Sequence, residues 1–192
     1  EMPWCDFKAF ESILTAIPDD SILQLGNSST VRYVQLFDIN KTLNVFCNRG
    51  TSGIDGCTST AVGAAVGSGI PTTLITGDLS FFYDSNGLWN KYIPHDFKII
   101  IINNSGGGIF RILPGSKDTP QFDEYFETIH DLDASHLSKT YAMDYYRADD
   151  EKGLKQALGA LYSKNEKPAI LEVFTPRKVN DDILLSYFKY IR

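Results

Sequence analysis

The chain alternates between short apolar runs and longer segments whose apolar residues recur at helical spacing. The runs at 71–76 and 97–102 are continuous and rich in β-branched residues, as in strands buried on both faces of a parallel sheet. Segment 4–17 instead repeats apolar residues every three or four positions, which is typical of a helix packed on such a sheet. The pattern predicts an α/β fold: a doubly wound, mainly parallel six-stranded sheet with helices on both faces.

The same reading gives expected bounds for each element. No internal repeat or linker interrupts the pattern, so we expect one domain over residues 1–192. Residues 104–125, rich in Gly, Pro and charge, are expected to form a long mobile loop. Strands are expected at 21–25, 43–47, 71–76, 97–102, 144–147 and 169–174, and helices at 4–17, 29–37, 57–67, 82–91, 134–141, 150–163 and 181–191.

Composition narrows the class of protein. The chain has 192 residues, a net charge of −6 and 43% hydrophobic residues, which is ordinary for a globular domain. The acidic balance argues against nucleic acid as a partner, and no apolar run is long enough to make a transmembrane segment. Three cysteines without paired spacing favour free thiols and a cytoplasmic protein.

Polar residues follow two of the predicted strands at the point where each strand ends. Asp78 comes just after 71–76, and Asn104 comes just after 97–102. Because the carboxyl ends of neighbouring parallel strands share one edge, we expect the Asp78 carboxylate and the Asn104 amide oxygen to lie close together. Oxygen donors of this kind suit Mg²⁺, which usually takes one or two carboxylates and completes its shell with phosphates and water.

Two glycine-rich loops, 77–80 and 104–108, extend this prediction to a diphosphate. Their backbone N–H groups, notably those of 106–108, and the Ser80 hydroxyl are expected to surround the anion. Each loop taken alone is also consistent with a simple turn. A dinucleotide site and a P-loop are excluded by pattern, because neither G-x-G-x-x-G after the first strand nor Gly-Lys-Ser/Thr is present.

Charged and apolar residues at the same edge suggest how an organic acid would bind. Arg32 and Arg49 follow strand ends, and guanidinium groups bind carboxylates through two hydrogen bonds. Ile54, Ile109 and Phe110 are apolar where a loop is usually polar, which favours the floor of a cofactor site. The alternatives are solvated surface arginines and ordinary core residues.

Four strings together resemble one enzyme family over essentially the whole chain. They are LGNSSTVR at 25–32, NRGTSGIDG at 48–56, GDLSFFYDSN at 77–86 and NNSGGGIF at 103–110. They look like the carboxy-terminal thiamin-diphosphate-binding domain of the menaquinone-pathway 2-succinyl-5-enolpyruvyl-6-hydroxy-3-cyclohexene-1-carboxylate synthases. Leu79 stands where the general thiamin-diphosphate signature has Gly, and it matches this family's own form of the motif.

The resemblance implies an activity and a set of site residues. The activity is that of a transferase (carboligase): decarboxylation of 2-oxoglutarate and 1,4-addition of the resulting four-carbon unit to isochorismate, with thiamin diphosphate and Mg²⁺ or Mn²⁺. The implied metal ligands are Asp78, Asn104 and the Gly106 carbonyl. Ile54 matches the residue that holds the cofactor bent. The implied cofactor-binding residues are Ile54, Asp78, Leu79, Ser80, Asn104, Gly106, Gly107 and Ile109. The implied substrate-binding residues are Ser28, Arg32, Arg49, Phe110 and Leu113.

The resemblance also implies partners. In that family the activating glutamate lies on the amino-terminal domain of a second subunit, so no catalytic residue is expected in this chain. Because the chain begins at Glu1, we expect a fragment that lacks the pyrimidine-binding and central domains and is inactive alone, from a homodimer or homotetramer. Two alternatives stay open: another thiamin-diphosphate decarboxylase or carboligase, and a noncatalytic α/β module.

Overall fold

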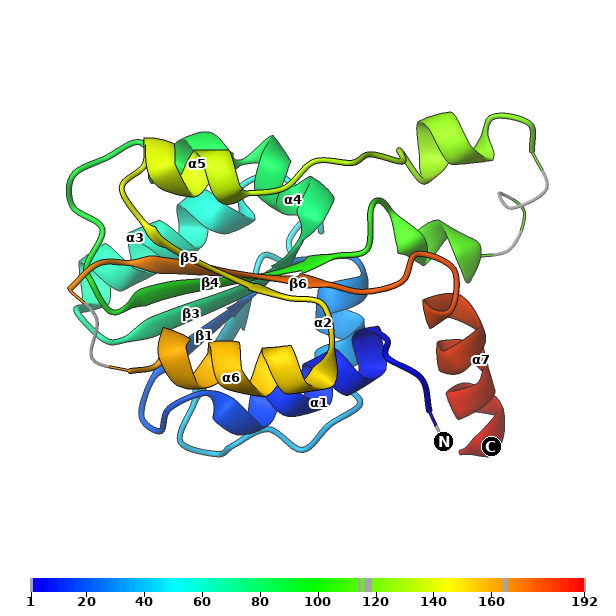
Figure 1. The fold of residues 1–192 in the computed structure, drawn as a ribbon, viewed down its shortest axis with the longest axis horizontal. Helices are drawn as coiled ribbons and strands as arrows, with labels where there is room; N and C mark the ends of the chain where they lie inside the picture. The colour runs from blue at the N-terminus through cyan, green and yellow to red at the C-terminus, as the bar shows by residue number, and fades with distance from the viewer. Residues whose placement is uncertain (1, 114, 116–118, 164–165, 192) are drawn as a thin grey trace.

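The centre of the molecule is one six-stranded sheet in which every pair of neighbours is parallel (Figure 1). The computed structural model describes residues 2–113, 115, 119–163 and 166–191. The strand order is β2-β1-β3-β4-β6-β5, which confirms the predicted sheet. The strands are β1 (Ile22–Leu25), β2 (Asn44–Cys47), β3 (Thr72–Gly77), β4 (Phe97–Asn103), β5 (Asp144–Ala148) and β6 (Ala169–Phe174).

Helices cover both faces of this sheet. In Figure 1, α3, α4 and α5 lie on one face, α1, α2 and α6 lie on the other, and α7 stands beside the carboxyl edge. None of the helices in the described part of the chain has the length and apolar character needed to cross a membrane. The helices are α1 (Asp6–Ala16), α2 (Ser29–Val34), α3 (Cys57–Ser68), α4 (Asp78–Tyr83), α5 (Ser135–Thr140), α6 (Glu151–Leu161) and α7 (Asn180–Tyr190).

The apolar run of β4 shows why the central strands have no alternating pattern. Ile99 and Ile101 pack into the core beneath α3 and α4, whereas Ile100 and Ile102 pack into the core beneath α1 and α6. All four side chains are buried. A strand covered on both faces needs apolar residues at every position, which is the pattern that the sequence has.

The strand order places a switch point between β1 and β3. The chain leaves β1 through α2 toward β2 on one side, and it leaves β3 through α4 toward β4 on the other. In open α/β sheets, the crevice that holds ligands forms where successive connections diverge in this way. Gly26 lets the two loops start close together, because a Cβ at this position would lie 2.8 Å from Thr76 Oγ1.

Two segments differ from the expectation. The predicted helix at 82–91 is wrong in its bounds: α4 begins at Asp78 and ends at Tyr83, and a 3₁₀ turn follows at Ser85–Leu88. The buried Asp84 ends α4 because its carboxylate accepts from the backbone N and hydroxyl of Ser59, at 2.7 and 2.6 Å.

The predicted long loop at 104–125 is only partly irregular. It contains a 3₁₀ turn at Gly108–Arg111 and the start of a single π-helical turn at Phe122–Phe126. Positions 114 and 116–118 lie outside the described residues, so the expected mobility there stays a prediction.

Candidate functional site

A cavity of about 230 Å³ opens at the switch point. The loops that follow β1, β3 and β4 line it, together with part of the segment after β2. The cavity therefore collects the predicted cofactor set and two members of the predicted substrate set. The predicted residues among its lining are Ser28, Ile54, Asp78, Leu79, Ser80, Asn104, Gly106, Gly107, Ile109 and Phe110.

Asp78 joins the loop after β3 to the loop after β4. It is the first residue of α4 and is only 2% exposed. Its Oδ1 accepts from the Leu79 backbone N at 2.7 Å, and its Oδ2 accepts from the Gly106 backbone N at 2.9 Å. The structure thus brings Asp78 and Gly106 together, although 28 positions separate them in the sequence.

Gly106 occupies a position that only glycine fits. Its φ is +146°, and a Cβ there would lie 2.5 Å from the Glu127 carbonyl oxygen. The Gly107 N–H donates to the same oxygen at 2.6 Å, and the Gly108 N–H donates to the Gly106 carbonyl at 3.1 Å. The N–H groups of all three glycines therefore have acceptors within the chain. The expectation that they surround a diphosphate stays a prediction.

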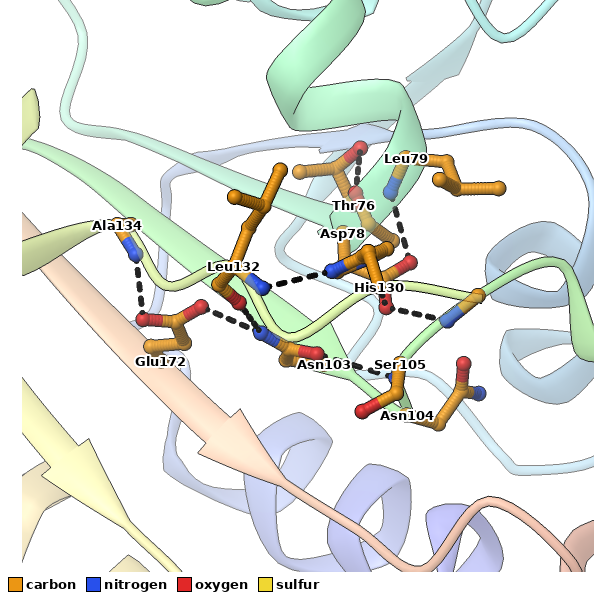
Figure 2. A network of polar contacts seen from close by, with 12 residues as sticks. Thr76, Asp78, Leu79, Asn103, Asn104, Ser105, His130, Leu132, Ala134 and Glu172 are labelled. Atoms are coloured by element: carbon orange, nitrogen blue, oxygen red, sulfur yellow. Dashed lines mark hydrogen bonds and ion pairs between the residues drawn. The ribbon is translucent and has the colours of Figure 1, made fainter. Parts of the chain in front are cut away.

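Asn104 is held at one end of its side-chain amide. Its Nδ2 donates to Asp6 Oδ2 at 3.0 Å, which leaves the amide oxygen at the other end. Asp6 is the buried first residue of α1, and burial raises its pKa to about 6, against the lowering effect of hydrogen bonds from Thr175 and Asn104. Figure 2 shows the side chains of Asp78 and Asn104 at the end of β4.

A second buried carboxylate holds the other asparagine of the pair. Glu172, on β6, has no exposed surface, and it accepts from Asn103 Nδ2 at 2.8 Å (Figure 2). Its carboxylate also accepts from Tyr145 Oη at 2.7 Å. It also accepts from the Ala134 backbone N at 2.9 Å. With its nitrogen fixed in this way, Asn103 accepts through Oδ1 from the Ser105 backbone N at 3.1 Å. Glu172 thereby shapes the loop that contains Asn104 and Gly106.

His130 approaches the Asp78 carboxylate from the segment between the π-helical turn and α5. Its Nε2 lies 3.3 Å from Asp78 Oδ2 without hydrogen-bond geometry, and its Nδ1 accepts from the Leu132 backbone N at 3.1 Å. The ring packs edge-on against Phe82. The Asp78 carboxylate raises the pKa of His130, while burial opposes this effect.

The donor chemistry at this edge fits a hard cation. Asp78 offers a carboxylate, Asn104 a side-chain amide oxygen and Gly106 a backbone carbonyl, which are the oxygen types that Mg²⁺ and Mn²⁺ prefer. The described residues contain no group of three or more His, Cys, Asp or Glu side chains placed to hold a metal. Among the described residues, the best candidate for a metal site is therefore this set of oxygen donors, which contains a single carboxylate.

The predicted substrate arginines do not line the cavity. Arg32 is exposed and donates to the Ser28 carbonyl at 2.6 Å, whereas Arg49 is exposed and donates to Asn27 Oδ1 at 2.9 Å. Both acceptor residues do line it, so the guanidinium groups stand at its rim. Leu113 is 43% exposed and also lies outside the lining.

Ser80 has a different contact from the one expected. Its hydroxyl donates to the Ile54 carbonyl at 2.5 Å, and therefore ties the loop after β2 to α4. In this arrangement the hydroxyl proton is not directed at a bound anion. Its contribution to the site is to hold Ile54 at the cavity wall.

Sequence reasoning missed Asp6, His130 and Glu172. Of these, Glu172 had a usable signal, because an acidic residue inside an otherwise apolar strand must have hydrogen-bond partners. Asp6 begins an amphipathic helix, where an acid is common, and His130 is a single histidine in a polar loop. Neither pattern points to a site.

Comparisons with known proteins agree with this geometry. Residues 26–173 match the model of the family described as "Thiamine pyrophosphate enzyme, C-terminal TPP binding domain". Curated relatives named 2-succinyl-5-enolpyruvyl-6-hydroxy-3-cyclohexene-1-carboxylate synthase include those of Christiangramia forsetii, 56% identical over 192 residues, and Flavobacterium johnsoniae, 61% identical over 184. The Porphyromonas gingivalis protein of that name is 42% identical over 189 residues.

The matches cover 100%, 96% and 98% of this chain but 33% of each relative, so the chain spans about a third of their length. The resemblance inferred from the four sequence strings is confirmed by these names. The fold, the cavity at the switch point and the family match agree. The chain belongs to the thiamine pyrophosphate enzymes and contains their C-terminal TPP-binding domain.

Proposed function

We propose that this chain supplies the diphosphate and metal half of a site for the 2-succinyl-5-enolpyruvyl-6-hydroxy-3-cyclohexene-1-carboxylate synthase reaction of menaquinone biosynthesis. The reaction is decarboxylation of 2-oxoglutarate followed by 1,4-addition of the remaining four-carbon unit to isochorismate. The observation that carries the proposal is the convergence of Asp78, Asn104 and Gly106 on one cavity, in a chain whose relatives bear that name.

In this proposal Mg²⁺ or Mn²⁺ is held by the Asp78 carboxylate, the Asn104 amide oxygen and the Gly106 carbonyl. Thiamin diphosphate, when bound, supplies the electron sink that a 2-oxo acid needs in order to lose CO₂. The glycine N–H groups already have acceptors within the chain, so the metal is the main link between this chain and the diphosphate. Ile54, Leu79 and Ile109 provide the apolar wall against which the organic part packs.

The arginines at the rim are proposed to bind substrate carboxylates. Arg32 and Arg49 donate to neutral oxygens, and a carboxylate is a stronger acceptor for a guanidinium group than either of these. Ser28 and Phe110 line the cavity, and they are proposed to contact the body of the substrate. Leu113 would contact substrate from beyond the lining.

We assign proton transfer to a partner. Among the described residues that line the cavity there is no glutamate to serve as the activating group. In the proposed assembly, a homodimer or homotetramer, the amino-terminal domain of a second subunit supplies it. This chain alone should then bind cofactor and metal but show no turnover with 2-oxoglutarate and isochorismate.

Calorimetric titration with thiamin diphosphate and Mg²⁺ tests the binding half. We expect Asp78→Asn to weaken binding by more than the roughly 10–100-fold that loss of an outer metal partner causes. Asp149→Asn is the control, because Asp149 is exposed and pairs with Arg147 on the edge strand β5. Equal binding by the two variants would contradict the proposed ligand set.

An activity assay tests whether turnover needs both this chain and the amino-terminal domain. This chain is mixed with a separately prepared amino-terminal domain, 2-oxoglutarate and isochorismate, and the product is identified by mass spectrometry. Turnover should require both parts. Turnover by this chain alone would overturn the assignment of the activating glutamate to a partner. A product formed only from other 2-oxo acids would favour another carboligase. If the assembled protein binds no cofactor, a noncatalytic module would be favoured.

A further inference from the structure

The two ends of an asparagine amide have nearly the same shape, but only the oxygen can bind a cation. A metal site that uses Asn104 therefore needs something that fixes which end faces the cavity. The structure contains such a contact: Asn104 Nδ2 donates to Asp6 Oδ2 at 3.0 Å. An ionised carboxylate can only accept, so the end of the amide that faces Asp6 must be the nitrogen.

Asp6 is itself held by contacts from separate parts of the fold. Its Oδ1 accepts from Thr175 Oγ1 at 2.5 Å, just after β6, and its backbone N donates to Asn180 Oδ1 at 2.8 Å, at the start of α7. Asn180 is in turn fixed by donation from its Nδ2 to the Pro176 carbonyl at 2.8 Å. Asp6 is 2% exposed, and these hydrogen bonds hold its carboxylate in place.

The location of Asp6 indicates a role beyond that of an acidic residue at a helix N-terminus. It lines the same cavity as Asp78 and Asn104, and it contacts Asn104 directly. Its carboxylate also adds negative charge next to the proposed cation without using a coordination position. Outer partners that orient a ligand commonly change metal affinity by about 10–100-fold.

We propose that Asp6 is a positioning residue for the metal: its carboxylate holds the Asn104 amide with the oxygen toward the cation. This inference rests on the proposed function, because it needs Asn104 to be a metal ligand. It assigns a positioning role to a residue of α1, whereas the proposed metal ligands lie just after the ends of β3 and β4.

The first test is Asp6→Asn in the intact protein, with Mn²⁺ as the probe. The introduced amide can accept from Thr175 with its oxygen, and its NH₂ then faces Asn104, so the Asn104 amide must turn and present its nitrogen to the cavity. We expect Mn²⁺ affinity, measured by electron paramagnetic resonance with thiamin diphosphate present, to fall about 10–100-fold. Competition with Mg²⁺ should show the same loss.

Thr175→Val is the matched control. It removes a hydrogen bond to the same carboxylate and lowers stability, but it leaves the contact between Asp6 and Asn104 in place. We expect Thr175→Val to lower the melting temperature while changing Mn²⁺ affinity less than about threefold. The Asn104 side-chain NH₂ signals in a ¹⁵N spectrum should shift in Asp6→Asn and remain in place in Thr175→Val.

The swapped pair Asp6→Asn with Asn104→Asp provides a rescue. The amide introduced at position 6 then donates to the new carboxylate at position 104, which again offers an oxygen to the cation, so affinity should return to within about tenfold of the original protein. If Asp6→Asn does not fold, the swapped pair alone decides: binding near the original supports the inference, and absence of binding by a folded pair overturns it.

The outcomes separate the two proposals. If the unmodified protein binds no Mn²⁺, the proposed function fails and this inference fails with it. If the unmodified protein binds Mn²⁺ and a folded Asp6→Asn variant binds it equally well, the inference alone is overturned.

Discussion

The loop after β4 and the loop after β2 both lie at the carboxyl edge of the sheet, but they are held very differently. In the first, Asn103 and Gly106 are buried, and hydrogen bonds tie the loop to Asp78 and Glu172. In the second, neutral groups hold the loop: Asn27 Nδ2 donates to the carbonyls of Asn48 and Gly53, each at 2.7 Å. The Arg49 side chain is exposed, and its guanidinium group donates to Asn27 Oδ1. The loop with two of the proposed metal ligands is thus held by two buried carboxylates, whereas the loop with a proposed substrate arginine is held by neutral groups and leaves that arginine exposed.

The largest expected effect comes from filling the tight position in the loop after β4. Gly106→Ala should lower the free energy of unfolding by about 3 kcal/mol, because φ is +146° and the Cβ would meet the Glu127 carbonyl. Gly63→Ala is the control: Gly63 lies inside α3 with open space around it, so the change should stabilise by about 0.5–1 kcal/mol. Urea denaturation measures both, and similar effects of the two changes would show that the loop is not tightly held.

The next largest effect on stability is expected at Glu172, the buried carboxylate that accepts a hydrogen bond from Asn103. Glu172→Gln should cost about 1–3 kcal/mol, because one of its two acceptor oxygens becomes a donor that faces other donors. Tyr145→Phe removes one hydrogen bond to the same carboxylate and should cost only about 1 kcal/mol. Thermal unfolding with and without thiamin diphosphate and Mg²⁺ compares them; a larger loss in Tyr145→Phe would place the important contact away from Asn103.

Lys98 is buried at the end of β4 that lies away from the cavity. The pH dependence of its contribution to stability therefore provides a test that does not involve the proposed site. Burial lowers the pKa of Lys98 below 10.5, although Asp144 and Asp96 oppose the shift, and its Nζ donates to the His95 and Lys167 carbonyls. Between the lowered pKa and 10.5 the unfolded state binds more protons at Lys98 than the folded state, so the contribution of Lys98 to stability should rise with pH in that window and fall as pH drops through the lowered pKa. Buried cysteines and tyrosines whose pKa values are raised, such as Cys5 and Tyr33, contribute a slope of the opposite sign.

Lys98→Met should remove this contribution, so that stability falls more steeply with rising pH than in the unmodified protein, as measured by urea denaturation at a series of alkaline pH values. The exposed Lys152→Met variant, in contrast, should keep it. A Lys98→Met variant with the same pH dependence as the unmodified protein would refute the assignment.

The smallest expected change in stability comes from the rim. Arg49→Ala and Arg32→Ala should each change the free energy of unfolding by no more than about 0.5 kcal/mol, because both side chains are exposed. In the assembled enzyme they should nevertheless raise KM for a carboxylate substrate more than they change thiamin-diphosphate affinity. Steady-state kinetics and calorimetry check the two halves; a stability loss as large as that of Gly106→Ala would remove the contrast between the loops.

The fold was predictable because strand order and helix coverage follow from coarse features. The continuous apolar runs at β3 and β4 indicate burial on both faces, and short alternating elements leave few arrangements other than a wound parallel sheet. The bounds of α4 were not predictable in the same way. The sequence around Asp78 is typical of a turn, and the carboxylate of Asp84 that ends the helix binds Ser59, which is 25 positions away.

The site was predictable only in part, for a related reason. Asp78, Asn104 and Gly106 follow strand ends, so the sheet itself brings them together. Asp6 and Glu172 accept hydrogen bonds from the asparagine pair, from which they are 98 and 69 positions away in the sequence. No local pattern shows which residues they bind. The acceptor of the Ser80 hydroxyl, the Ile54 carbonyl, was likewise not predictable, because it depends on how the loop that contains Ile54 packs.

The outermost strand on the β1 side has a practical consequence for handling the protein. Within the described part of the chain β2 pairs only with β1, and its Val45 and Phe46 residues are 38% and 54% exposed. An uncovered strand edge with apolar side chains is a template for pairing with another molecule, and thus for self-association at high concentration. A lysine at position 45 should therefore keep concentrated samples monodisperse in light scattering, and it would do so without touching the cavity.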